Sequence, residues 1–251
     1  MHTKVIELNK IRVGAVSYLN TKPLIYGVKR SGLLMEKIVL SEEYPSKIAA
    51  GLLNDEIDVG LVPVAIIPLL KEAHIITDYC IGAEQEVASV GIFSEVPMEN
   101  IETVLLDYQS RTSVNLAKVL LKHYWKKEVV LQDANEDFRE HIGGTTAGVV
   151  IGDRALEQRK ISKYNYDLAA GWVDFTGLPF VFAAWVANKK LPEDFIDAFN
   201  RANGFGVHHL DAILAENSFE HYDLKKYYTR NISYALTDEK RKGLEKFLEY
   251  L

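Results

Sequence analysis

The stretch Val13-Gly-Ala-Val-Ser-Tyr-Leu-Asn-Thr-Lys-Pro-Leu24 decides the fold class of this 251-residue chain. It opens with small apolar residues, which are typical of a buried strand, and polar residues follow at once. Thr21 is a candidate cap for a helix, and Pro23 suits its first turn, where a missing N–H breaks no bond. The stretch therefore predicts a strand that runs directly into a helix.

Ser17, Tyr18 and Asn20 lie in this stretch between the strand and the helix. In open α/β sheets, ligands bind at the carboxyl ends of the strands. The free N–H groups at a helix N-terminus favour an anion there. We therefore expect these three residues to contact an anionic ligand; the alternative is that they form only a turn.

The rest of the chain alternates apolar runs with amphipathic stretches. Strands are expected over residues 11–17, 57–63, 88–94, 103–106, 128–131, 147–151 and 179–187. Helices are expected over residues 21–30, 45–53 and 135–142, an amphipathic helix after Ser113 is indicated by apolar residues at 117, 120, 121 and 124, and the chain reads as wholly helical after Pro192. Repeated strand–helix units predict an α/β fold with a mainly parallel sheet.

Two segments, residues 88–97 and 180–190, read as crossings between two lobes. Residues 1–93 together with 184–251 would form a discontinuous first lobe, and residues 94–183 an inserted second lobe. A ligand cleft between two such lobes suits a small molecule that is enclosed by hinge closure.

The bulk composition excludes several classes of protein. The formal net charge is −6 and no basic tract appears, which argues against nucleic-acid binding. No apolar run approaches the roughly 20 residues of a membrane span, and residues 1–10 lack the apolar core of a secretory signal. We therefore expect neither a membrane span nor a secretory signal. Cys80 is the only cysteine, which excludes an internal disulfide and a cysteine-based zinc site.

Further polar residues stand where expected strands end. Ser110, Arg111, Thr112 and Ser113 begin a helix and suit a carboxylate, although they would also serve as a plain helix cap. Asp153 follows a buried strand and has the same two interpretations.

Thr176 and Gly177 are expected in a tight loop, with Gly177 allowing close backbone approach to a ligand. Ser89 stands at the start of the first crossing and is expected to face the cleft. Trp172, Phe175 and Phe180 either wall the pocket or belong to the core.

The sequence lacks the motifs of several common chemistries. It has no glycine-rich nucleotide loop after a strand and no nucleophile elbow. Its seven histidines, from His2 to His221, show no metal-ligand spacing. We expect neither a metal nor an organic cofactor. The polar loops are rich in hydroxyl, amide and N–H donors and poor in general bases, which indicates a site for a small anionic molecule.

Five motifs in this order resemble the chorismate dehydratases of the futalosine route to menaquinone. They are Ser17-Tyr-Leu-Asn-Thr-Lys-Pro-Leu24, Asp58-Val-Gly-Leu-Val-Pro63, Ser110-Arg-Thr-Ser113, Ile151-Gly-Asp153 and Thr176-Gly-Leu-Pro-Phe180. The resemblance covers nearly the whole chain. It implies the two-lobed type II periplasmic-binding-protein fold, a cytoplasmic location and no cofactor.

The implied reaction removes water from chorismate to give 3-[(1-carboxyvinyl)oxy]benzoate. Asn20 would act at the reacting edge of the substrate. Substrate contacts would come from Ser17, Tyr18, Ser89, Ser110, Arg111, Thr112, Ser113, Thr176 and Gly177. The base stays open between Asp153 and the enolpyruvyl carboxylate of the substrate itself.

Three alternatives remain for the function. One is a solute-binding protein of the same fold without chemistry, and another is a ligand-sensing domain of a regulator, against which the lack of a DNA-binding segment speaks. The third is the sister enzyme 1,4-dihydroxy-6-naphthoate synthase, whose first loop differs from Tyr18-Leu-Asn20 and is rich in proline and aspartate. A monomer and a homodimer are both compatible with the sequence.

Overall fold

The opening apolar segment forms a central strand, as expected. β1 (Ile11–Val16) is buried from Val13 onward and pairs in parallel with β2 (Ile38–Glu43) and β3 (Val59–Pro63). The computed structural model describes residues 10–251. The expectation about a secretory signal and the expectation for His2 therefore concern a segment, residues 1–9, that lies outside the described residues.

The first sheet has six strands in the order β11-β4-β10-β3-β1-β2. Its remaining strands are β4 (His74–Ala83), β10 (Phe180–Ala187) and β11 (Ser233–Ala235). β10 is antiparallel to both β3 and β4, and β11 is antiparallel to β4. The expectation of a mainly parallel sheet was therefore wrong. The chain leaves this sheet along β4 and re-enters it along β10, so these neighbours run in opposite directions.

The second sheet has five strands in the order β7-β6-β8-β5-β9. They are β5 (Val90–Ser94), β6 (Thr103–Leu106), β7 (Val130–Asp133), β8 (Thr146–Ile151) and β9 (Tyr164–Asp167). β6 is parallel to β7 and β8, whereas β5 is antiparallel to β8 and β9. β7 is the strand that was expected over residues 128–131, but it begins two residues later, at Val130.

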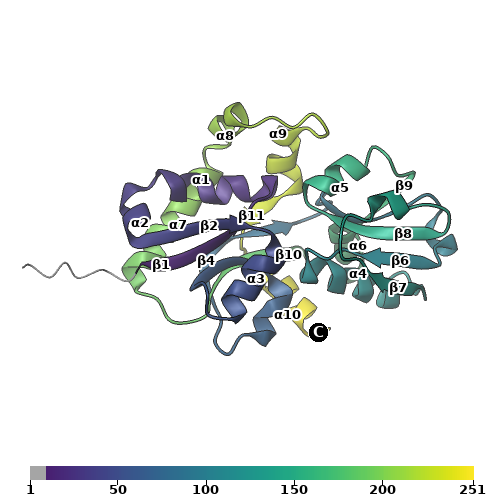
Figure 1. The fold of residues 1–251 in the computed structure, drawn as a ribbon, viewed down its shortest axis with the longest axis horizontal. Coiled ribbons are helices and arrows are strands. Elements are labelled where there is room, and N and C mark those ends of the chain that lie inside the picture. The colour runs from purple at the N-terminus through teal and green to yellow at the C-terminus, as the bar shows by residue number, and fades with distance from the viewer. Residues whose placement is uncertain (1–9) are drawn as a thin grey trace, which may run out of the picture.

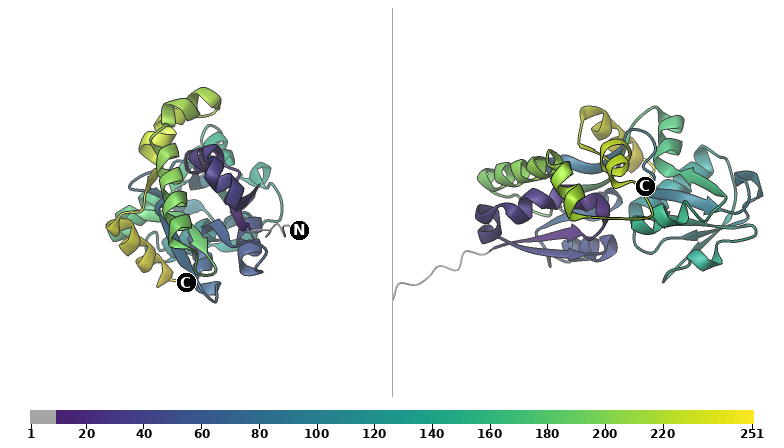
Figure 2. Two further views of the ribbon diagram at one scale, coloured as in Figure 1. Left: turned by 90° about the vertical axis from the view of Figure 1, so that its left-hand side faces the viewer. Right: turned by 90° about the horizontal axis from the view of Figure 1, so that it is seen from above.

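Helices cover both sheets. Those before β5 and after β10 are α1 (Lys22–Arg30), α2 (Gly32–Lys37), α3 (Pro45–Leu53), α7 (Glu193–Val207), α8 (Leu210–Glu216), α9 (Leu224–Lys226) and α10 (Asp238–Leu248). Those between them are α4 (Arg111–His123), α5 (Asp153–Gln158) and α6 (Leu168–Thr176). Figure 2 shows the green α7 beside the purple α1, although more than half of the chain separates them in sequence. Short 3₁₀ turns are η1 (Leu19–Thr21), η2 (Val64–Leu69), η3 (Met98–Asn100) and η4 (Arg139–His141), and η5 (Tyr227–Asn231) is a π-helical turn.

The chain crosses between the sheets twice, after β4 and before β10. Figure 1 shows the resulting two lobes, with the first sheet on the left and the second on the right. The expected α/β, two-lobed fold class is therefore confirmed. The boundaries after residue 93 and before residue 184 stay a prediction; β5 pairs in the second sheet and β10 in the first.

Three local expectations were wrong. Residues 135–142 form only the short turn η4, because the Asp137 carboxylate accepts the Arg139 N–H (3.2 Å) and competes with helix formation. The segment after Pro192 is not wholly helical, since β11 pairs with the edge of the first sheet. Thr21 makes no cap bond; its hydroxyl donates to Asn20 Oδ1 (3.3 Å) instead.

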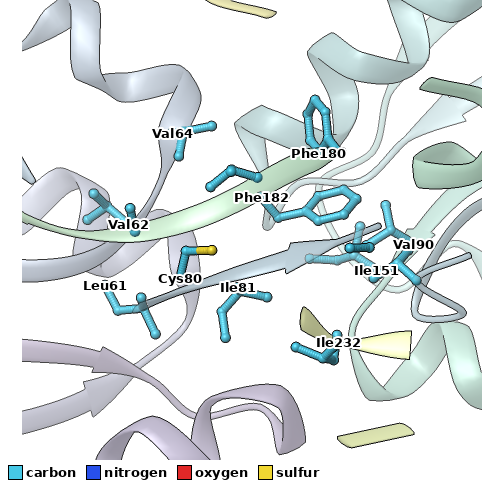
Figure 3. Packing of buried hydrophobic residues seen from close by; sticks show 14 of the residues in the cluster. Leu61, Val62, Val64, Cys80, Ile81, Val90, Ile151, Phe180, Phe182 and Ile232 are labelled. Carbon is cyan, nitrogen blue, oxygen red and sulfur yellow. The ribbon is translucent and has the colours of Figure 1, made fainter. Parts of the chain in front are cut away.

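One apolar core runs through both lobes. Figure 3 shows Phe182 of β10 beside Val90 and Ile151 of the second sheet, with Ile81 of β4 close by. Trp172 of α6 packs edge-on against Phe180, with ring centroids 5.4 Å apart. This shared core holds the two lobes in one arrangement. Among residues 10–251, no helix combines the length and hydropathy that a membrane span requires.

Candidate functional site

A pocket lies where the two sheets meet and is partly open to solvent. Apolar side chains from β3, β4, β5, β8 and β10 form most of its wall, among them Ile81, Val90, Ile151 and Phe182. The polar lining residues are Tyr18, Asn20, Thr21, Ser89, Ser110 and Ser113, which come from both lobes. Apolar walls with a few converging polar groups are typical of a small-molecule site.

Asn20 is held in place through its backbone. The Tyr234 hydroxyl of β11 donates to the Asn20 carbonyl oxygen (3.0 Å). Tyr18 lies against Gly152, where an added Cβ would come within 3.0 Å of the tyrosine ring. Gly152 also has a φ of +64°, so both its conformation and this contact favour glycine. The Tyr18 hydroxyl donates to Gln109 Oε1 of the second lobe.

Ser89 is fully buried and follows a strained residue. Ala88 has a φ of +65°, a left-handed conformation that alanine rarely adopts. The Asp167 carboxylate accepts the N–H groups of Val87 (3.1 Å) and Ala88 (2.8 Å), and the Gly152 N–H donates to the Ser89 carbonyl (2.8 Å). These bonds hold the turn in its strained form and fix where Ser89 stands. Within residues 10–251, Ser89 Oγ has no hydrogen-bond partner.

Ser110 and Ser113 mark the N-terminus of α4. Ser110 Oγ accepts the Ser113 N–H (3.3 Å), and the two hydroxyls are 3.0 Å apart. Both residues line the pocket. A helix N-terminus with two hydroxyls suits a carboxylate, because N–H and O–H donors converge there.

Asp153 begins α5 in the second lobe, and its side chain makes a hydrogen bond to the first lobe. Its Oδ1 accepts the Leu19 N–H of the first loop (3.2 Å). Burial raises the pKa of Asp153 to about 6, although the Leu19 N–H and the Lys22 ammonium act to lower it. Its neighbour Gly152 lines the pocket, whereas Asp153 itself is not among the lining residues.

The structure places five other predicted site residues away from the pocket lining. Ser17 is exposed and lines a separate hollow with Lys22. Arg111 is exposed at the start of α4. Thr112 is buried, and its hydroxyl accepts the Ala65 N–H (3.1 Å) of the first lobe. Their contact with substrate stays a prediction.

Thr176 and Gly177, the remaining two, end a helix and do not form a loop. The Thr176 hydroxyl donates to the Trp172 carbonyl (2.8 Å) and accepts the Leu178 N–H (3.2 Å). Gly177 has a φ of +73° and terminates α6. This left-handed conformation at a helix end accounts for a glycine here, and no contact with a ligand is needed to explain it. Trp172 and Phe180 are fully buried in the core, and Phe182 lines the pocket in their place.

Several polar groups near the pocket were missed from the sequence. Tyr227 and Tyr228 bring buried hydroxyls to the first lobe, and Arg154 pairs with the buried Asp107 (2.8 Å). Tyr227 and Tyr228 fall in a stretch that reads as an ordinary helix and carries no motif. No sequence pattern therefore marks these two tyrosines, and their burial follows only from long-range packing.

The pocket lining is electrically neutral. Among the described residues that line it, none is aspartate, glutamate, lysine, arginine or histidine. An anionic ligand would therefore be held by hydroxyl, amide and backbone N–H donors, which are strong when water is excluded. Over residues 10–251, no group of three or more histidine, cysteine, aspartate or glutamate side chains converges as metal ligands would.

Comparisons with known proteins agree along nearly the whole chain. The family model described as menaquinone biosynthesis matches residues 11–251. A chorismate dehydratase of Thermus thermophilus is 26% identical over 264 residues, which cover 95% of this chain and 94% of the relative. A chorismate dehydratase of Campylobacter jejuni is 26% identical over 244 residues, covering 94% of this chain and 95% of the relative.

Solved structures share the fold at low sequence identity. A protein of Archaeoglobus fulgidus superposes with a TM-score of 0.75 at 15% identity, covering 96% of both chains. A Candida albicans protein described as having the generic periplasmic-binding-protein fold gives a TM-score of 0.63 at 11% identity, covering 96% of this chain and 90% of the other. These likenesses concern the fold alone.

Proposed function

The chain belongs to the menaquinone biosynthesis family, and we propose that it acts there as a chorismate dehydratase. The proposed reaction converts chorismate into 3-[(1-carboxyvinyl)oxy]benzoate and water. The observation that carries this proposal is the neutral, donor-rich pocket between the lobes. The two relatives named chorismate dehydratase, each aligned over about 95% of its length, support the same substrate.

The reaction makes modest demands on the protein. The C3 proton and the C4 hydroxyl leave chorismate, and the ring becomes aromatic, which supplies the driving force. The site must hold two carboxylates, stabilise the negative charge that develops, and assist the departing hydroxyl. Neutral donors in a pocket with apolar walls meet these demands, because their dipoles are fixed before the reaction starts.

We assign the contacts from the residues that line the pocket. Ser110 and Ser113 at the N-terminus of α4 bind one carboxylate. Tyr18 and Ser89 contact the second carboxylate or the C4 hydroxyl, and Asn20 hydrogen-bonds at the reacting edge. The base is either Asp153, which would have to reach past Gly152, or the enolpyruvyl carboxylate of chorismate. A chorismate analogue without that carboxylate should bind and not react if the substrate supplies its own base.

Product formation tests the function directly. Incubation of the purified protein with chorismate should give a product lighter by one water with an aromatic ultraviolet spectrum, faster than chorismate decays alone. Recovery of unchanged chorismate from folded protein would contradict the proposal. Bound but unchanged chorismate would favour the solute-binding alternative, which rests on the shared fold.

Asn20 offers the sharpest test of the assigned contacts. We expect Asn20→Ala to lower kcat by about 100-fold and to change KM much less, because a donor that acts on developing charge works mainly in the transition state. Asn115→Ala is the matched control, since Asn115 lies on α4 and its amide only donates to the Arg111 carbonyl. Full turnover by Asn20→Ala would remove Asn20 from the mechanism.

The resemblance to chorismate dehydratases also supports a cytoplasmic location for this protein, as part of the same proposal. Its small-molecule partner would be chorismate. A monomer and a homodimer both fit, and neither the pocket nor the assigned contacts need a second copy of the chain.

A further inference from the structure

The hydroxyl of Tyr227 is buried in the first lobe and makes no hydrogen bond with the described residues. Tyr227 has no exposed surface, and its Oη has no hydrogen-bond partner among residues 10–251. Buried polar groups are nearly always bonded, so such a group calls for an explanation. Tyr227 begins the π-helical turn η5, a conformation that is rare and often found at functional sites.

Ser89 is the second unpartnered hydroxyl at the same place. Burial raises the pKa of Tyr227, while the nearby Ser89 hydroxyl and Asn20 amide act to lower it. Asn231, the last residue of η5, donates its side-chain amide to the Glu86 carbonyl oxygen (3.1 Å), which places η5 beside the segment that leads into Ser89. Within residues 10–251, neither hydroxyl meets hydrogen-bond geometry with a partner. Ser89 lines the pocket, and Tyr227 is not among its lining residues.

We propose that Tyr227 is a positioning residue that acts through Ser89. When substrate binds, the Tyr227 hydroxyl donates to Ser89 Oγ, and the Ser89 hydroxyl donates to an oxygen of the substrate. Each bond in such a chain polarises the next, so Ser89 becomes a stronger donor to an oxygen that gains negative charge. No proton is transferred along the chain. This inference rests on the proposed dehydratase function.

Tyr228 provides a control that is matched in almost every respect. It is the next residue in η5, it is also buried, and its hydroxyl also lacks a partner among the described residues. Ser89 and Asn20 are among the groups that act on the pKa of Tyr227, whereas burial and Asp153 are the causes that raise the pKa of Tyr228. Loss of the Tyr228 hydroxyl therefore reproduces the structural change of Tyr227→Phe without the proposed bond.

The test compares Tyr227→Phe, Tyr228→Phe, Ser89→Ala and the double variant Tyr227→Phe/Ser89→Ala in chorismate turnover and thermal unfolding. Tyr227→Phe should lower kcat/KM about tenfold, the size of one lost neutral hydrogen bond. Tyr228→Phe should stay within about twofold of wild type. The double variant should equal Ser89→Ala, because a residue that acts only through Ser89 has no effect once Ser89 is gone.

Thermal stability separates this role from a structural one. Tyr227→Phe should unfold at the same or a higher temperature than wild type, because it removes an unpaired buried hydroxyl. The inference is overturned if Tyr227→Phe keeps the full kcat/KM of wild type. It is also overturned if the double variant shows the product of the two single decreases in kcat/KM, or if the Tm of Tyr227→Phe falls in parallel with its activity. If wild-type protein itself gives no product, the proposed function fails and this inference falls with it.

Discussion

At the scale of single residues, Asp153 shows how burial changes the chemistry of a carboxyl group. Among residues 10–251, its carboxylate accepts a hydrogen bond only from the Leu19 N–H (3.2 Å), and burial raises its pKa from 3.8 to about 6. The charged form is therefore less favourable in the folded protein than in the unfolded chain. Between about pH 4 and pH 6 the folded state binds more protons, so the free energy of unfolding falls as the pH rises through this window.

Asp153→Asn should remove this pH dependence, because asparagine is neutral and still accepts the Leu19 N–H. We expect the variant to match wild type near pH 4 and to be more stable near pH 7.5, by at most about 3 kcal/mol. Urea unfolding at both pH values measures the difference. Asp197→Asn on exposed α7 is the control. A stability difference that is the same at both pH values would contradict the raised pKa.

At the scale of elements, Asp167 joins α6 to the turn that precedes Ser89. Its carboxylate accepts the N–H groups of Ala169 (3.0 Å) and Ala170 (3.1 Å) at the start of α6. It also accepts the N–H groups of Val87 and Ala88 on the neighbouring segment. A single buried side chain thus caps a helix and holds the strained turn beside the pocket.

Asp167→Ala should cost more than the loss of an ordinary cap, because four N–H groups lose their acceptor. We expect the free energy of unfolding to fall by about 2–4 kcal/mol. Asp223→Ala is the matched control: Asp223 is an exposed cap with one bond, to the Lys226 N–H (3.1 Å), and its loss should cost about 1 kcal/mol or less. Denaturant unfolding gives both values. Equal costs for the two variants would show that the bonds to Val87 and Ala88 add nothing.

At the scale of the whole molecule, several hydrogen bonds join the lobes around the pocket, and three of them involve the first loop, η2 and the start of α4 or α5. Tyr18 donates to Gln109, the Leu19 N–H donates to Asp153, and the Ala65 N–H donates to Thr112. Each has one partner in the first lobe and one in the second. Together with the shared core, they favour the arrangement in which the lobes enclose the pocket.

Gln109→Ala removes one of these bonds without changing a residue that lines the pocket. We expect KM for chorismate to rise about three- to tenfold with little change in kcat, because the enclosed arrangement becomes less populated before substrate binds. Small-angle scattering of the substrate-free variant should show a larger radius of gyration than wild type. Gln132→Ala on the exposed edge strand β7 should change neither quantity. An unchanged KM in Gln109→Ala would mean that this bond does not hold the lobes together.

Much of the architecture could be predicted from local patterns. The apolar run before Ser17, the helix with Pro23 in its first turn, and the two crossings led to a two-lobed α/β fold, which is confirmed. Hydrophobic periodicity and turn residues are local patterns, and they predict the same helix or strand whichever segment packs against its apolar face. The same local patterns predicted that Asn20, Ser89, Ser110 and Ser113 lie near the ends of strands. In the structure all four residues line one pocket.

Only the tertiary structure decided which of these polar groups face the pocket. Ser17 lines a separate hollow, and the Thr112 hydroxyl accepts the Ala65 N–H, because side-chain direction depends on register and on partners from distant segments. The same holds for β11, which forms because β4 leaves an edge to be paired, and for Tyr227, which η5 brings beside Ser89. The chain itself thus determined the elements and the chemistry available at their ends. Long-range packing determined the antiparallel strands between the lobes and the buried hydroxyls behind the pocket, since contacts between residues more than a hundred positions apart leave no local pattern.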